Sequence, residues 1–151
     1  MPEKETLERA EEDKREGKAP STQAGEFVRK EIEHVREGKH GARSTKQAIA
    51  IGLSKARRAG VDLPPPEKGK ASTKTRKQAA RDVRKGKSAS KGKKSAKRSR
   101  ATSSALKREG HSAASKKALS RQARSAAAKR SAAARSRAAK KAAATRKRVK
   151  R

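Results

Sequence analysis

The sequence predicts a mostly disordered chain with one small all-α element, a helical hairpin over residues 21–37 and 44–59. Three observations lead to this fold class. The chain carries 46 Lys and Arg against 15 Asp and Glu, a net charge of +31 over 151 residues. Only 30% of the residues are hydrophobic, and Phe27 is the one aromatic residue. Few large apolar side chains combined with a high net charge are typical of chains that do not fold.

The charge is unevenly distributed and divides the chain into parts. Residues 1–40 hold 9 basic and 11 acidic side chains, whereas residues 67–151 hold 32 basic and 3 acidic ones. We therefore expect an acidic N-terminal helix over residues 1–18, a helical hairpin domain over 19–63, a proline linker at 64–66 and a disordered basic tail over 67–151.

The N-terminal segment predicts a solvated helix over residues 3–16, since only Leu7 and Ala10 offer apolar surface and Gly17 ends the run. It could fold onto the basic tail and weaken binding there, although a solubilising extension is the favoured interpretation. The segment lacks the apolar stretch of a signal peptide. The longest apolar run, residues 48–53, is far too short to span a membrane.

The best helix in the sequence covers residues 21–37. Its apolar residues recur at the three-and-four spacing of one buried face: Ala24, Phe27, Val28, Ile32 and Val35. Glu31 falls in the middle of that face, so either a cation on the partner helix pairs with it or this face is only half covered. Gly38 suits the end of the helix.

The second helix covers residues 44–59 and begins with a capping box formed by Ser44 and Gln47. Gly60 follows as a stop signal, and the small residues Gly52 and Ala56 lie on a face that permits close helix approach. The following chain, with Val61 and Leu63, is expected to fold back over the hairpin before residues 64–66, all proline. So small a core is marginal alone, which favours self-association or a protein partner bound through the hairpin.

The tail consists almost entirely of Lys, Arg, Ala, Ser, Thr and Gly. We expect it to be disordered when free, because no core can form from these residues. Ala is the strongest helix former and like-charge repulsion opposes it, so a polyanion should induce helical segments in the bound tail.

Cations separated by small residues can follow a phosphate backbone and release its counterions. The tail therefore predicts nucleic-acid binding without sequence preference. The expected contact residues are Lys93, Lys94, Lys97, Arg98, Arg100, Lys116, Lys117, Arg121, Arg124, Lys129, Arg130, Arg135, Arg137, Lys140, Lys141, Arg146, Lys147, Arg148, Lys150 and Arg151.

The hairpin also carries basic residues that suggest a second basic face, as in a helix-turn-helix reader. They are Arg43, Lys46, Lys55, Arg57 and Arg58. Two helices normally need a third to make that motif a stable domain, so packing or dimerisation is the favoured role of the hairpin.

The stretch SAAAKRSAAARSRAAKKAAATRKR resembles the Lys/Ala-rich C-terminal tails of linker histones and of bacterial histone-like proteins. Pro is absent after residue 66, unlike in eukaryotic linker-histone tails, so the resemblance implies a bacterial origin. Residues 21–66 resemble a short uncharacterised domain of small basic bacterial proteins, through the stretch KHGARSTKQAIAIGLSKARRAG. That resemblance implies no activity.

Together these features predict a cytoplasmic, nucleoid-associated protein that binds and compacts duplex DNA. The alternatives are an RNA-binding or ribosome-associated protein and an adaptor that recruits a protein partner to DNA through the hairpin. No enzyme is expected, since a two-helix hairpin has no room for a preorganised pocket. No cofactor or membrane contact is expected. A metal site at His34 and His40, with Glu31 and Glu37 nearby, is set aside, because the chain has no Cys and His40 lies on a Gly-flanked loop.

Overall fold

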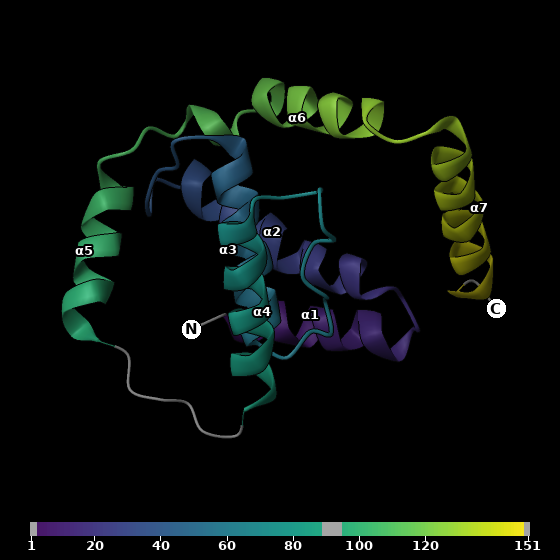
Figure 1. The fold of residues 1–151 in the computed structure, drawn as a ribbon, viewed down its shortest axis with the longest axis horizontal. Coiled ribbons are helices and arrows are strands. Elements are labelled where there is room, and N and C mark those ends of the chain that lie inside the picture. Colours follow the sequence, from purple (N-terminus) through teal and green to yellow (C-terminus); the bar gives the residue numbers. More distant parts are fainter. Residues whose placement is uncertain (1–2, 89–94, 150–151) are drawn as a thin grey trace.

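The computed structural model describes residues 3–88 and 95–149, and within them helices joined by loops make up the fold (Figure 1). Seven α-helices and one 3-10 helix follow one another in these residues: α1 (Lys4–Arg15), α2 (Pro20–Arg36), α3 (Thr45–Arg58), α4 (Thr73–Lys87), α5 (Ala96–Lys107), η1 (Ser112–Ala114), α6 (Lys116–Ala128) and α7 (Ala132–Val149). In Figure 1 the first four helices form a central body, and α5, α6 and α7 surround it as separate rods.

The expectation of a mostly disordered chain is therefore wrong, since helices account for about three-quarters of the described residues. The disordered tail is the largest error, because α4 to α7 all lie within residues 67–151. The expectation that the basic tail becomes helical only when it binds a polyanion is wrong for the same reason. These segments are already helical in the free chain.

Helices α2 and α3 pack closely, and small residues make this possible. Ala48, Gly52 and Ala56 recur every four residues along α3, and all three are buried. A Cβ atom placed on Gly52 would lie 2.6 Å from the Cα of Val28 on α2. Gly52 therefore lets the two backbones approach more closely than any other residue would allow.

The core consists of two small clusters, one toward each end of this helix pair. One contains Ile32 and Val35 of α2 with Ala42, Ala48, Ala113 and Ala114. The other surrounds Phe27, which is 2% exposed, with Ala10, Ala24 and Ala56. Ala therefore supplies most of the buried hydrophobic positions.

Helix α1 packs against α2, which corrects the expectation of a solvated N-terminal helix. Thr6, Ala10 and Asp13 share its buried face, and Leu7 packs on the Phe27 cluster. The turn into α2 is short because Gly17 adopts a φ of +71°. An acidic helix with few apolar residues docks here because its small residues fit closely against α2.

The ends of α2 and α3 follow the stop signals in the sequence. Gly38 and Gly60 adopt positive φ after the two helices, as αL termination requires. Ser44 caps α3 by accepting a hydrogen bond from the backbone N–H of Gln47. The Gln47 side chain departs from an ideal capping box and accepts from the N–H of Arg43 at 2.7 Å.

Packing continues beyond the three prolines at residues 64–66. Val61 and Leu63 fold back onto the Phe27 cluster, as their position in the sequence predicts. Helix α4 then packs against α3 through Ala79, Asp82 and Gly86. A Cβ on Gly86 would lie 2.0 Å from the carbonyl oxygen of Arg57, so this contact also depends on glycine.

Residues 106–115 anchor the second half of the chain to the hairpin. The N–H of Gly41 donates to the carbonyl of Leu106 at 2.9 Å, and that of Ala42 donates to Gly110 at 3.0 Å. In η1, the carbonyl of Ala113 accepts from the Thr45 hydroxyl at 2.6 Å, and the carbonyl of Ala114 accepts from Arg36 Nε at 2.8 Å. Two buried alanines and four hydrogen bonds hold this segment in place.

Serines begin each helix of the second half. Ser72, Ser95, Ser115 and Ser131 each accept a hydrogen bond from the backbone N–H three residues later. Each of these caps satisfies a backbone donor that the first turn of a helix leaves free, and is worth about 1 kcal/mol. Together with Ala, these caps explain how helices form in so highly charged a segment.

Candidate nucleic-acid interface

The outer face of α4 concentrates five cations. At about 100° per residue, they fall within an arc of about 100°. All five are exposed, and none has a carboxylate within 4.0 Å among the described residues: Lys74, Lys77, Arg81, Arg84 and Lys85. We call this set the α4 cationic face. Side chains that project from one side of a helix can all reach the same polyanion.

The opposite face of α4 fixes its orientation. Asp82 is 1% exposed and accepts hydrogen bonds from Arg58 Nε and from the Ser54 hydroxyl, both at 2.7 Å. Gln78 donates to the same carboxylate at 3.2 Å. The single acidic side chain of α4 is thus engaged in hydrogen bonds to α3. The cations of the α4 cationic face remain exposed to solvent.

Helix α6 shows the same division into an anchored face and a cationic face. Leu119 packs on the Ile32 and Val35 cluster. At about 100° per residue, Lys117, Arg121 and Arg124 lie roughly opposite Leu119, and all three are exposed. The anchor at η1 therefore presents α6 with its cations toward solvent.

Helices α5 and α7 are exposed along most of their length. On α7 the cations surround the helix and form no single face. The remaining sequence-predicted contact residues that the structure describes are exposed on these helices or beside α6: Lys97, Arg98, Arg100, Lys116, Lys129, Arg130, Arg135, Arg137, Lys140, Lys141, Arg146, Lys147 and Arg148. Lys93, Lys94, Lys150 and Arg151 lie outside the described residues.

Arg148 touches the acidic N-terminal helix. Its Nη2 donates to the carbonyl oxygens of Glu16 at 3.3 Å and Gly17 at 3.1 Å, just beyond the last turn of α1. A cation is favourable at the C-terminal end of a helix, where backbone carbonyls lack partners. This contact joins the two ends of the chain through a single side chain.

The second basic face on the hairpin is largely engaged in internal contacts. Lys55 pairs with Glu31, and Arg58 pairs with Asp82. Arg57 is 7% exposed and donates to the carbonyls of Leu63 and Pro64. Burial lowers the pKa of Arg57 below its usual range. Two members of the set, Arg43 and Lys46, are exposed.

The α4 cationic face is absent from the residues chosen by sequence reasoning. Its signal was present, since the cations at 74, 77, 81, 84 and 85 follow the three-and-four spacing of one helix face. The single acid at position 82 falls on the opposite side. Treating the tail as one uniform polymer hid this periodicity.

Comparison with known proteins identifies only part of the chain. Residues 21–68 match a family described as a family of unknown function, DUF6496. This confirms the resemblance of the hairpin region to a short uncharacterised domain. No curated protein and no solved structure matches the chain. Among the described residues, no helix is long and apolar enough to cross a membrane.

Proposed function

We propose that this protein binds duplex nucleic acid through phosphate contacts and without sequence preference, and that duplex DNA is its main partner. The observation that carries the proposal is the α4 cationic face, held outward by Asp82 on a folded body. In a cell, such a protein would coat or compact DNA as a cytoplasmic, nucleoid-associated factor. The Lys/Ala-rich composition of residues 125–148, which resembles that of histone-like tails, supports this proposal.

The physical mechanism is release of counterions from the phosphates. From Lys74 to Lys85 the α4 axis extends about 16 Å at 1.5 Å per residue. A duplex carries one charge per ~1.7 Å, so about 10 phosphate charges lie along that length. Five cations on one side of the helix therefore meet enough phosphates without distortion of either partner.

The arrangement favours contacts to phosphates over contacts to bases. Between the cations of α5 to α7 lie mainly Ala, Ser and Thr, which offer little to distinguish one base pair from another. The one aromatic side chain, Phe27, is buried, so aromatic stacking on unpaired bases has no platform. Cationic helices on different sides of the body in Figure 1 favour contact with more than one duplex segment, as compaction needs.

A competition experiment tests this function. Labelled duplex DNA is bound by the full chain, and unlabelled DNA or structured RNA competes at several salt concentrations. The label is needed because the chain has no Trp or Tyr. We expect preference for DNA and a log–log salt slope of about −9 or steeper, which corresponds to ten or more phosphate contacts.

Preference for RNA would instead support the ribosome-associated alternative. A shallow salt slope with strong dependence on base sequence would contradict the proposal, because recognition would then rest on base edges.

A further inference from the structure

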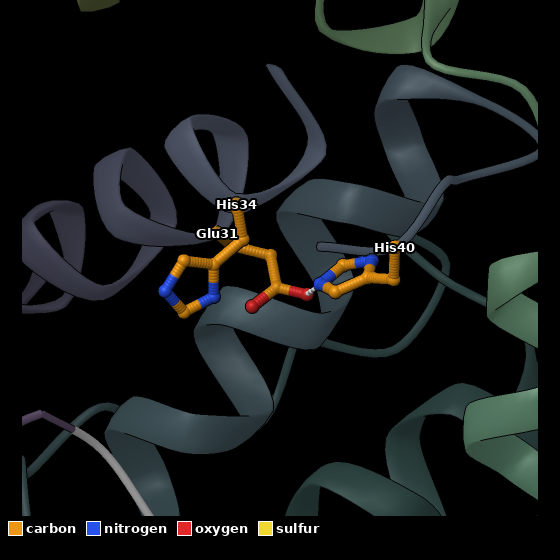
Figure 2. Close-up of side chains that lie close together, drawn as sticks. All are labelled: Glu31, His34 and His40. Carbon is orange, nitrogen blue, oxygen red and sulfur yellow. Dashed lines mark ion pairs between the residues drawn. The ribbon is translucent and has the colours of Figure 1, made fainter. Parts of the chain in front are cut away.

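The buried carboxylate of Glu31 lies between two histidines (Figure 2). Glu31 and His34 lie one turn apart on α2, and His40 comes from the loop that follows it. Glu31 is 1% exposed, and the side chains of His34 and His40 are 15% and 16% exposed. One potential ligand atom from each of the three residues lies within 4.8 Å of the others. This cluster is separate from the cationic faces of α4 and α6.

Hydrogen bonds fix which ring nitrogen of each histidine carries the proton. His34 Nε2 lies 2.9 Å from the carboxylate of Glu3, and His40 Nδ1 lies 3.0 Å from the carbonyl of Gly41. Both oxygens accept hydrogen bonds, so these two nitrogens act as donors. In neutral rings, His34 Nδ1 and His40 Nε2 then hold lone pairs. Figure 2 shows both of these nitrogens facing the Glu31 carboxylate.

The carboxylate of Glu31 has one oxygen without a hydrogen bond. Lys55 Nζ donates to Oε2, whereas Oε1 is buried and has no hydrogen-bond partner. His40 Nε2 lies 3.1 Å from Oε1, but the two atoms are not aligned as a hydrogen bond. When His40 is protonated, this contact is an ion pair, drawn as a dashed line in Figure 2. With a neutral His40, two electron-pair donors face each other where a cation would be expected.

The distance between two of the ligand atoms is close to that expected around a metal ion, although it also fits an ion pair within the protein. With ligand bonds of about 2.0–2.1 Å, two ligand atoms of a tetrahedral Zn²⁺ ion lie about 3.3–3.4 Å apart. The separation between His40 Nε2 and Glu31 Oε1 is 3.1 Å. His34 offers a ligand atom within 4.8 Å of the other two, so its side chain would move closer to complete the set.

The outer contacts of the histidines also match those of metal ligands. A histidine that binds a metal usually donates its other ring N–H to a carboxylate or a backbone carbonyl. His34 donates to the carboxylate of Glu3, and His40 donates to the backbone carbonyl of Gly41.

A small cavity adjoins Glu31 and His34. The volume open to the centre of a water molecule is about 20 Å³. One water needs about 10–15 Å³ by this measure, so a water has room beside two of the three proposed ligands; His40 does not line the cavity.

We propose that Glu31, His34 and His40 bind one divalent transition-metal ion, with Zn²⁺ as the expected occupant. Imidazole nitrogens favour Zn²⁺ over Mg²⁺ or Ca²⁺, which take oxygen ligands. The ion would join α2 to the loop whose Gly41 and Ala42 hold residues 106–110. The site therefore links metal binding to the anchor of the basic helices.

The test measures Zn²⁺ affinity of the full-length chain after treatment with EDTA, by competition with a chromophoric chelator. The variants are His34→Gln and His40→Gln, and His111→Gln is the matched control, because His111 is exposed and outside the cluster. We expect one Zn²⁺ per native chain and unchanged binding in the control. Binding in the two variants should be at least ~100-fold weaker, because loss of a ligand should cost no less than loss of a hydrogen bond that orients a ligand.

Glu3→Gln keeps the test decisive if a ligand variant fails to fold in EDTA, as judged by circular dichroism. It leaves all three proposed ligands in place and should weaken Zn²⁺ binding about 10–100-fold. Lys55→Gln should strengthen binding, since it removes a cation that competes for the same carboxylate. Absence of binding, or equal binding in native chain, ligand variants and Glu3→Gln, would overturn the proposal and assign any zinc to surface carboxylates.

Discussion

Neutralising the middle of the α4 cationic face should weaken DNA binding strongly while the fold persists. The variant replaces Lys77, Arg81 and Arg84 with Gln. All three side chains are exposed and none has a carboxylate partner among the described residues. Lys, Arg and Gln have similar helix propensities, and exposed substitutions usually change stability by less than about 0.5 kcal/mol. The thermal melt should therefore hardly move.

The size of the effect follows from counterion release. Each phosphate contact contributes about 0.9 to the log–log salt slope, so losing three contacts should reduce the slope by about 2.7. If the two proteins bind equally at 1 M salt, this difference in slope corresponds at 0.15 M salt to an affinity loss on the order of 100-fold. Fluorescence anisotropy of labelled duplex DNA at four or five salt concentrations measures both quantities.

The matched control removes the same three charges from α1, by replacing Lys4, Arg9 and Lys14 with Gln. These residues are exposed on an acidic helix, where Lys4 and Arg9 pair with glutamates one turn away, and net charge changes equally in the two variants. Charges beyond the Debye length of about 8 Å are largely screened at physiological salt, so the control should leave the slope nearly unchanged. Equal losses in both variants would refute the role of α4, because net charge alone would then explain binding.

Three further predictions concern packing and pH. Gly52→Ala should destabilise the chain by about 1–3 kcal/mol by overpacking α2 against α3, whereas Gly25→Ala, with nothing within 4 Å of its Cβ, should be neutral or stabilising in urea denaturation. Gly86→Ala should lower DNA affinity at constant charge, because its Cβ would lie 2.0 Å from a carbonyl of α3; unchanged affinity would show that docking of α4 is dispensable. Hydrogen bonds from a lysine and a histidine of α2 lower the pKa of Glu3 to about 2. The stability this gives is present above pH 4.5 and lost as pH falls toward 2, so the stability difference between native chain and Glu3→Gln, measured in EDTA, should shrink over that range.

The hairpin was predictable because its apolar residues are large and periodic. The predicted ranges 21–37 and 44–59 differ from Pro20–Arg36 and Thr45–Arg58 by one residue at each end. Of the two alternatives left open for Glu31, the structure has the cation on the partner helix, which is Lys55 of α3. In these helices the hydrophobic pattern and the stop residues indicate the same structure, and Ser44 caps α3. The caps available to α2 in the sequence, Ser21 and Thr22, are not used, because that helix begins at Pro20 without a side-chain cap.

The second half was not predictable from composition, because the residues that anchor it contribute little to a hydrophobicity sum. Ala79, Ala113 and Ala114 are buried against the first half of the chain. Backbone hydrogen bonds to Gly41 and Ala42 add to this anchor. Disorder criteria count large apolar groups, so they miss packing that depends on small residues and close backbone contact.

The serines of the tail illustrate the same failure. In a low-complexity segment, a Ser among Ala and Lys residues looks interchangeable with its neighbours. Ser115 and Ser131, however, each cap a helix, and the Ala-rich run that follows each of them supplies the propensity to extend it. Local helix signals outweighed the like-charge repulsion that sequence reasoning treated as decisive.

The conformation of Gly38 bears on the metal site that the sequence argued against, in part because His40 lies on a Gly-flanked loop. A histidine beside glycines was taken to be too loosely held to serve as a ligand. Gly38 adopts a φ of +73°, and the N–H of Lys39 donates to the carbonyl of His34 at 3.0 Å. This αL turn reverses the chain at the end of α2 and brings His40 back over Glu31. The glycine that appeared to loosen the loop is the residue that directs His40 into the cluster, so spacing along the chain underestimated how close the three side chains lie.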